Sequence, residues 1–247
     1  KNGYVFDQAT GMSIGIIAAA SYHNQQDTYG PRHWNSAQTN AYLNAIFQTS
    51  FDDSATDLWD DHSHNLSTGL SINFDGYNEE LYLSDAINAP YNLNRREITP
   101  GIFAEYTYTY KDKVTLLAGI REDYSTRYGF FTTPRMNLRY APFEWWTLRG
   151  SIGLGYRTPN AIADNAAYLP SNRIYQYYAP LHNATPYYTT LDNAQLAQEH
   201  SMNTGLSTVF YIPIGKRELQ LSGEYYYTKF LNGVIADMDC SVHSITL

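Results

Sequence analysis

The chain has 247 residues, which is enough for one large all-β unit or two ordinary domains. Its formal net charge of −8 argues against nucleic acid as a partner, because neutralising phosphate groups requires a basic surface. A single cysteine, Cys240, excludes an internal disulfide framework, and no apolar run is long enough for a transmembrane helix.

Taken in chain order, the sequence alternates between segments with an apolar residue at every second position and segments rich in turn-forming residues. Such alternation is typical of strands that are apolar on one face only. We predict about nine full strands and one partial strand at the start, each near ten residues long. The clearest strands cover 14–22, 66–74, 98–110, 114–123, 135–140, 146–157 and 219–228. Helices should be few, with 160–168 as the candidate.

The predicted strand at 146–157 is the most informative. One face carries Trp146, Leu148, Ile152, Leu154 and Tyr156, and the other carries Thr147, Arg149, Ser151, Gly153, Gly155 and Arg157. The apolar face begins and ends with an aromatic residue; at roughly 3.3 Å per residue and a tilt near 40°, it spans about 25 Å. That height matches the lipid-facing band of an outer-membrane β-barrel, and the polar face suits a wet lumen.

The connections between strands alternate in length. The expected short ones are 7–11, 52–61, 111–113, 142–144 and 213–216, and the expected long ones are 23–36, 78–94, 125–131 and 158–197. This order predicts an up-and-down barrel with short periplasmic turns and long extracellular loops. The 24 tyrosines fit that prediction, because tyrosine concentrates where a side chain is apolar at one end and hydrated at the other.

Several ordered motifs resemble the barrel of TonB-dependent receptors. They are the run 133–142 (TPRMNLRYAP), Trp146-Thr147-Leu148-Arg149, the run 153–159 (GLGYRTP), Glu199 with Asn203 and Gly205, and the run 225–230 (YYYTKF). The resemblance covers most of the chain in the right order, with strand lengths that fit.

This resemblance implies a 22-strand barrel in the outer membrane of a Gram-negative bacterium. In the family, an N-terminal plug fills the barrel, TonB supplies the energy, and the cargo is a scarce ligand such as a ferric siderophore, haem, cobalamin or an oligosaccharide. We expect the plug, the TonB box and the closing C-terminal strand to lie outside residues 1–247. We therefore expect residues 1–247 to be an internal barrel fragment that meets outer-membrane lipid, a small-molecule or oligosaccharide ligand, and TonB through a plug domain not present in this chain.

Charged residues gather on the predicted lumen face. The set comprises Arg121, Arg135, Arg139, Arg149 and Arg157 with Glu105, Asp123 and Glu224. One interpretation is that these residues pair with each other or with a plug, so that each charge is compensated. The other is that they contact the ligand or take part in gating. Arg157 is the best functional candidate because it lies nearest the outer mouth; Arg121 and Arg149 are the next.

The predicted outer loops are rich in tyrosine and asparagine. Rigid amphipathic rings mixed with amides suit the capture of a planar or sugar-like ligand, although the same residues could simply pack against one another. We take Tyr128, Tyr175, Tyr177 and Tyr178 as the candidate ligand-binding residues of these loops.

Other motifs favour no catalytic, metal or cofactor site. The glycine-rich run 150–155 lies inside a predicted strand with no helix after it, which is the wrong context for phosphate binding. His62 and His64 could chelate a metal with the nearby aspartates of 52–61, but we favour a solvated acidic turn that leads into a strand. An outer-membrane hydrolase would need an outward-facing histidine beside a serine, and we expect no outward histidine in the strands.

Two alternatives remain open at this point. A passive porin or channel barrel would show the same alternating connections and arginine-lined lumen, and an encoded plug domain would separate it from a TonB-dependent receptor. A soluble tyrosine-rich all-β carbohydrate-binding protein would instead be released without detergent as a folded monomer.

Overall fold

The computed structural model describes residues 2–8, 10–51, 62–83, 90–171, 173–179, 187–189, 196–239, 241 and 243–247, with the side chains of 177–179 and 187–189 outside the description. Within this part of the chain no helix is long and apolar enough to cross a membrane. The chain is almost all β, and its one large sheet is antiparallel and unclosed.

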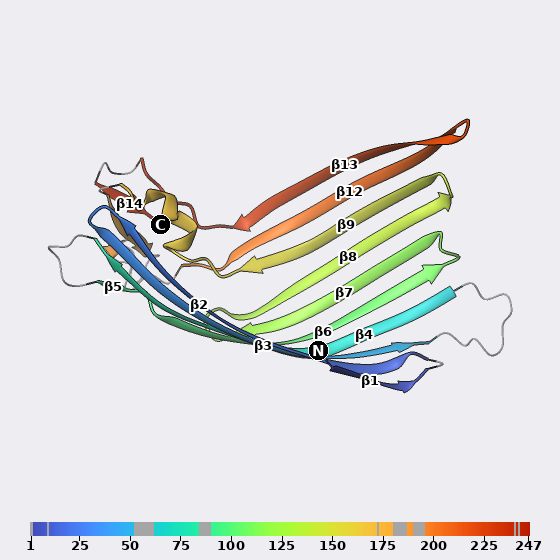
Figure 1. Cartoon of the computed structure of the whole chain (residues 1–247), viewed down its shortest axis with the longest axis horizontal. Coiled ribbons are helices and arrows are strands. Elements are labelled where there is room, and N and C mark those ends of the chain that lie inside the picture. Colours follow the sequence, from blue (N-terminus) through green and yellow to red (C-terminus); the bar gives the residue numbers. More distant parts are fainter. Residues whose placement is uncertain are drawn as a thin grey trace.

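The main sheet follows the order of the chain. Its strands are β1 (Asn2–Asp7), β2 (Met12–Tyr29), β3 (Arg32–Ser50), β4 (His62–Tyr82), β5 (Tyr91–Asn92), β6 (Arg95–Tyr110), β7 (Val114–Ser125), β8 (Gly129–Phe143), β9 (Trp146–Arg157), β12 (Glu199–Ile214) and β13 (Arg217–Asn232). They pair in the order β1-β2-β3-β4-β6-β7-β8-β9-β12-β13, and β5 pairs with β4. The sheet curves into an open trough with β1 and β13 at its edges (Figure 1).

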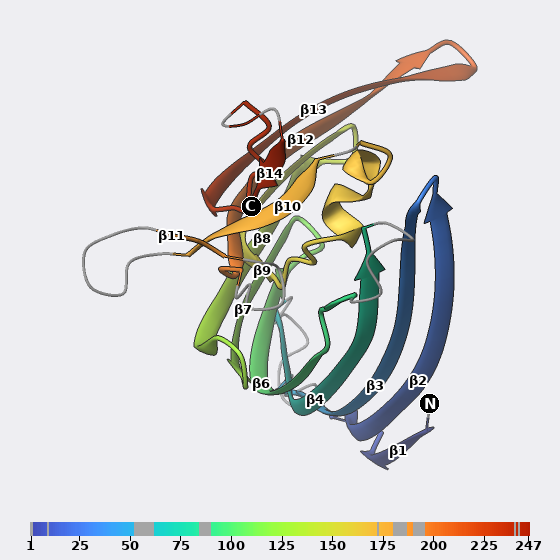
Figure 2. The same ribbon diagram turned by 90° about the vertical axis from the view of Figure 1, so that its left-hand side faces the viewer.

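A smaller three-stranded sheet lies at one end of the trough. It contains β10 (Ile174–Ala179), β11 (Tyr187–Thr189) and β14 (Ser244–Thr246), and the 3₁₀ helix η1 (Ala163–Tyr168) precedes it. These elements lie on the concave side of the main sheet (Figure 2). We call this concave side the inner face and the convex side the outer face. The end that carries the smaller sheet is the loop end, and the opposite end is the turn end.

The predicted fold class is confirmed: a partial antiparallel barrel with nine long strands and a short one at the start. The predicted strand length is wrong, because the long strands have 12 to 21 residues. Two predicted long loops are also wrong. Residues 23–36 form the ends of β2 and β3 around a turn at Gly30, whose φ of +61° suits glycine, and residues 126–128 form a tight turn.

The wrong strand lengths and the two wrong loops have one physical cause. Beyond the apolar band the strands carry polar residues on both faces, so their sequence loses its alternation while the backbone ladder continues. Tyr22 pairs with Thr39, and the β2–β3 ladder runs on without interruption to Tyr29 and Arg32. The predicted short helix at 160–168 is confirmed in its second half as η1.

The predicted separation of faces is confirmed by the register. Arg135 pairs with Gly153, Asn137 with Ser151 and Arg139 with Arg149, while the residues between them form apolar pairs such as Met136 with Ile152. Residues directly opposite in an antiparallel pair lie on the same face. The outer face carries exposed large apolar side chains, among them Leu70, Ile102, Ile120, Met136 and Leu221.

Aromatic side chains mark both ends of this apolar band. At the turn end, Trp145 and Trp146 each stack on Phe210, and Trp145 also stacks on Phe143, with centroid distances of 5.2 to 6.4 Å. At the loop end, the ring of Tyr156 lies 4.3 Å from that of His200. Trp146 and Tyr156, the two aromatics that bound the apolar face of β9, therefore lie in separate aromatic clusters at opposite ends of the strand.

The buried hydrophobic core is small and lies at the loop end. Among the described residues, the buried apolar side chains are Trp34, Leu81, Ala161, Ile162, Leu169, Tyr175, Leu196, Ile245 and Leu247. They come from the ends of β3 and β4, from the segment between β9 and β12, and from the C-terminal segment. We call them the loop-end core. The core fixes the smaller sheet to the inner face and leaves the outer apolar face uncovered.

Candidate functional site

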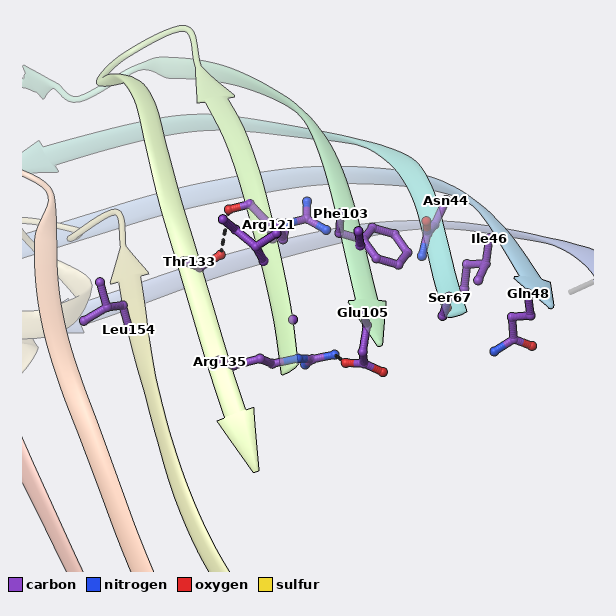
Figure 3. Close-up of a pocket in the computed structure, with 13 residues that line it drawn as sticks. Asn44, Ile46, Gln48, Ser67, Phe103, Glu105, Arg121, Thr133, Arg135 and Leu154 are labelled. Atoms are coloured by element: carbon purple, nitrogen blue, oxygen red, sulfur yellow. Dashed lines mark hydrogen bonds and ion pairs between the residues drawn. The ribbon is translucent and has the colours of Figure 1, made fainter. Parts of the chain in front are cut away.

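The inner face is lined with polar and charged side chains around a cavity of about 530 Å³. Figure 3 shows how neighbouring strands contribute to its wall. The labelled residues are Asn44, Ile46 and Gln48 of β3, Ser67 of β4, Phe103 and Glu105 of β6, Arg121 of β7, Thr133 and Arg135 of β8, and Leu154 of β9. Because the register places residues of one face in rows across the strands, the charges form a ladder rather than an isolated pair.

Arg121 is the most firmly held of these charges. Its Nε and Nη2 atoms donate to the Asp123 carboxylate at 2.6 and 2.5 Å, and Nη2 also donates to the Ser71 hydroxyl at 2.6 Å. Gly101 lies between Ser71 and Asp123 in the register, and a Cβ there would fall 2.7 Å from Arg121 Nη2. The missing side chain therefore lets Arg121 reach from β7 across β6 to Ser71 on β4.

The other inner-face arginines differ in their partners. Arg135 forms an ion pair with Glu105, and Arg139 donates to the carbonyl oxygen of Asp112 at 2.5 Å. Arg149 is exposed and lies opposite Arg139 on one side and Ser207 on the other. Within the described part of the chain, Arg149 forms no ion pair, so its guanidinium remains available to an anionic group.

Arg157 joins three elements at the loop end. Its Nε donates to Glu199 on β12 at 2.6 Å, and its two Nη atoms donate to the Asp164 carboxylate on η1 at 2.8 and 3.0 Å. Asp164 also accepts the backbone N–H of Asn160 at 2.8 Å. Arg157 thus lies at the loop end and holds η1 against the end of the sheet, and its role toward a ligand stays a prediction.

Two buried carboxylates connect the inner face to the segment that follows β9. Glu79 accepts hydrogen bonds from Asn160 Nδ2 at 2.9 Å and from the Ser36 hydroxyl at 3.2 Å, and its second oxygen lies 3.5 Å from Arg95 Nη1. Glu97 accepts the Ser125 hydroxyl at 2.6 Å and the Thr158 hydroxyl at 3.2 Å. Hydrogen bonds offset the burial of Glu97 and of Glu79 Oε1, whereas Glu79 Oε2 accepts no hydrogen bond from the described residues and is balanced by the charge of Arg95.

Arg32 of β3 also binds the segment between β9 and β12. Its Nη2 atom donates to the carbonyl oxygen of Arg173 at 2.6 Å, and Nη1 donates to that of Leu169 at 3.3 Å. Arg32, Glu79 and Glu97 are not among the residues predicted from the sequence. Arg32 and Glu79 fall in ranges that were predicted to be loops, and the partners of all three lie far away in the sequence.

The candidate tyrosines have different surroundings. Tyr175 belongs to the loop-end core, and its hydroxyl donates to the carbonyl oxygen of Asn165 at 3.1 Å. Burial raises the pKa of Tyr175 to about 12. Tyr128 is half-buried, and its hydroxyl donates to the Leu196 carbonyl oxygen at 3.1 Å. Tyr177 and Tyr178 lie in β10, with side chains outside the described atoms, so their role stays a prediction.

The expectation that the strands carry no outward histidine is wrong. His62 and His64 pair with Tyr110 and Tyr108, and this row of the β4–β6 register lies on the outer face. Their Nδ1 atoms lie 2.6 Å from the hydroxyl groups of Tyr108 and Tyr106, respectively. The apolar alternation begins only after these histidines, which is why the sequence placed them in a turn. The aspartates of 52–61 lie outside the described residues.

Comparison with known proteins places these features in a family. The model described as "TonB dependent receptor-like, beta-barrel" matches residues 2–244, while no curated protein matches the chain. The siderophore receptor PirA from Pseudomonas aeruginosa is similar in structure, with a TM-score of 0.56 and 16% identity over 95% of this chain and 43% of that protein. The ferric citrate transporter FecA has a TM-score of 0.56 and 12% identity, over 98% of this chain and 36% of that protein. The chain thus spans less than half the length of these proteins.

Proposed function

Because the chain belongs to the TonB-dependent receptor β-barrel family, we propose that it forms part of the wall of an outer-membrane receptor in a Gram-negative bacterium. In this proposal the whole protein imports a scarce ligand: a ferric siderophore, haem, cobalamin or an oligosaccharide. The similar structures bear the names of a siderophore receptor and a ferric citrate transporter, which favours an iron chelate among these ligands.

One observation carries the proposal: the outer face is apolar and uncovered, whereas the inner face is charged and hydrogen-bonded. A soluble sheet would bury its apolar face against another layer, but here Leu70 and Ile102 are 62% and 55% exposed. Lipid is the environment that such a face requires. The uncovered edges at β1 and β13 would each need a further strand, because unpaired backbone groups are costly in hydrocarbon.

Within this receptor the loop-end opening is the proposed site of ligand capture. Arg157 and Tyr128 lie at the loop end. Tyr175 is buried in the loop-end core, so it would support the opening rather than contact the ligand, and Tyr177 and Tyr178 belong to β10, as Tyr175 does. Arg121 and Arg149 lie on the inner face. Arg149 lies toward the turn end, opposite Arg139, so it would contact the ligand below the opening; it is the strongest candidate there because it is exposed and has no carboxylate partner within the described residues. Arg121 and Arg157 would have to exchange an existing ion pair for the ligand.

The proposal includes TonB as the energy source, acting through a plug domain. The experiment is uptake into cells that carry the whole protein, with a panel of ⁵⁵Fe-labelled catecholate and hydroxamate siderophores, haemin, cyanocobalamin and maltooligosaccharides. We expect uptake of one panel member, lost when tonB is deleted. Uptake that persists without TonB would instead support a passive channel.

Besides TonB-dependent and TonB-independent uptake, a third outcome concerns whether the protein is in the membrane. If the protein remains in solution without detergent and binds oligosaccharide as a folded monomer, the membrane proposal fails and the soluble carbohydrate-binding alternative stands. Separation of membranes from the soluble fraction, before any uptake assay, gives this result directly.

A further inference from the structure

A second cavity, of about 900 Å³, opens near the loop end of β2, β3, β4 and β6 and lies apart from the inner-face cavity. Most of its lining residues, among them Tyr22, Thr39, Phe74, Gly76 and Arg96, lie on the outer face, and two inner-face residues, Tyr77 and Arg95, also line it. The register places Gly76 between Thr39 and Arg96 on the outer face. Because most of the lining belongs to the outer face, the cavity opens mainly toward the surroundings of the barrel.

The hollow exists because Gly76 has no side chain. The ring of Phe74 lies close to the space above Gly76, since a Cβ at this position would fall 3.3 Å from Phe74 Cζ. A larger residue would fill the gap between Thr39 and Arg96. The aromatic ring thus forms an apolar wall beside an arginine.

Arg96 points away from the charged network of the inner face. Its neighbours Arg95 and Glu97 belong to that network: Arg95 pairs with Glu79 and lies 3.8 Å above the ring of Tyr77, and Glu97 is buried. Because successive side chains of a strand alternate in direction, Arg96 faces outward. It is exposed, and the described residues give it no ion pair. Among the described residues, no carboxylate therefore compensates the Arg96 guanidinium in this hollow.

The residues on either side of the hollow along the strands show where it lies between the loop end and the turn end. Toward the turn end, the outer face carries Ile72, Ile98 and Ile102, which are exposed and apolar. Toward the loop end, it carries Asn78 and Glu80, and Glu80 accepts a hydrogen bond from the Tyr82 hydroxyl at 3.3 Å. The hollow lies where the outer face changes from apolar to polar. In a membrane protein this is the level of lipid headgroups.

We propose that this hollow binds the phosphate group of a membrane lipid, with Arg96 as the main contact. The planar guanidinium presents paired N–H donors that match phosphate oxygens. The amides of Asn78 and Asn94, which also line the cavity, can donate to the remaining headgroup oxygens. The acyl chains of the same lipid would then cover Ile72, Phe74 and Ile98. The inference rests on the proposed membrane location.

The test measures lipid retained by the whole protein purified in dodecyl maltoside. Native mass spectrometry counts bound dioleoyl phosphatidic acid over a range of lipid concentrations, and dioleoylglycerol serves as the matched lipid without phosphate. We expect Arg96→Gln to raise the apparent Kd for phosphatidic acid about tenfold, and Gly76→Leu to have a similar effect because it fills the hollow. Arg96→Lys should lose less, since it keeps the charge.

Lys216→Gln is the control, because it removes the same charge from the exposed turn between β12 and β13 at the opposite end. Heat-dependent mobility on gels shows whether each variant is folded. If Arg96→Gln does not fold, the test relies on Arg96→Lys and Gly76→Leu. Equal affinity of folded variants and wild type, or equal retention of dioleoylglycerol, overturns the proposal. Displacement of the lipid by equimolar inorganic phosphate also overturns it, in favour of a free-anion site. A protein that needs no detergent contradicts the membrane location itself.

Discussion

Arg139 and Arg149 lie directly opposite each other on the inner face of β8 and β9. Like charges in this position destabilise an antiparallel pair by roughly 0.2–1 kcal/mol. Arg139 is partly compensated by the carbonyl oxygen of Asp112, but Arg149 has no carboxylate partner within the described chain. A pair that weakens the sheet is consistent with a function that needs positive charge at this position.

The first prediction concerns Arg149. We expect Arg149→Gln to leave thermal stability unchanged or slightly higher, because it removes a repulsion. The same change should lower the affinity for the panel ligand that shows TonB-dependent uptake by about tenfold, or ~1.4 kcal/mol. Equilibrium binding and thermal unfolding in detergent measure the two effects, with Lys216→Gln as the control. Loss of stability together with unchanged binding would assign Arg149 a purely structural role.

The second prediction concerns Arg157, which differs from Arg149 because its charge is paired. Arg157→Gln removes the hydrogen bonds to Glu199 and Asp164 and leaves two carboxylates close together. Since Arg157 is partly exposed, solvent screens the loss, and we expect a cost of about 1 kcal/mol. Limited proteolysis should then cut the segment between β9 and β12 faster than in the wild type. An unchanged cleavage rate would show that the contact does not hold this segment.

The third prediction concerns Asn160, which performs two tasks. Its Nδ2 donates to Glu79, and its Oδ1 accepts the backbone N–H groups of Ile162 and Ala163 at 3.0 Å each. Asn160→Ala removes these bonds and should destabilise the start of η1 by about 1–3 kcal/mol. Hydrogen exchange should accelerate in 160–168 but not in β8. Asn137→Ala, an exposed inner-face change on β8, is the control, and equal exchange in both variants would contradict the prediction.

The fourth prediction concerns the close approach of an aromatic ring to a glycine. Phe103 lies across Gly69, so that a Cβ on Gly69 would fall 2.7 Å from Phe103 Cζ and would also press on the Ala45 carbonyl oxygen. We expect Gly69→Ala to cost about 1–3 kcal/mol because neither the ring nor the backbone can yield freely. A Cβ on Gly15 would meet nothing within 4 Å, so Gly15→Ala should be close to neutral. Chemical unfolding in detergent compares the two variants.

The sequence predicted the features that depend on local alternation. The two faces of β9, the charged row on the inner face and the tight turn at Lys111 and Asp112 all follow from residues that are near in the chain. The attachment of the smaller sheet did not follow, because it joins Glu79 to Asn160 and Arg32 to Arg173 across long sequence separations. The register and the fold of the whole segment decide such contacts.

The hydropathy pattern also did not predict strands where both faces of the strand are polar. The loop-end parts of β2 and β3 carry Asn24, Gln25, Gln26, Asn35 and Ser36, which give no alternation. Their strand conformation comes from the continuing backbone ladder and from the turn at Gly30. The extent of the strands beyond the apolar band is therefore a property of the backbone pairing, and the apolar pattern marks only the part that faces lipid.

The last prediction concerns Tyr175 and alkaline pH. Burial raises the pKa of Tyr175 to about 12 in the folded protein, whereas the same phenol in the unfolded chain keeps its ordinary pKa near 10. Its contribution to stability is therefore fully present below pH 10 and is lost as the pH rises through 12, because the unfolded chain ionises first. The absorbance at 295 nm of the wild type minus that of Tyr175→Phe should titrate near pH 12. A difference that titrates near pH 10 would mean that the phenol is exposed to water, and that the loop-end core is not closed around it.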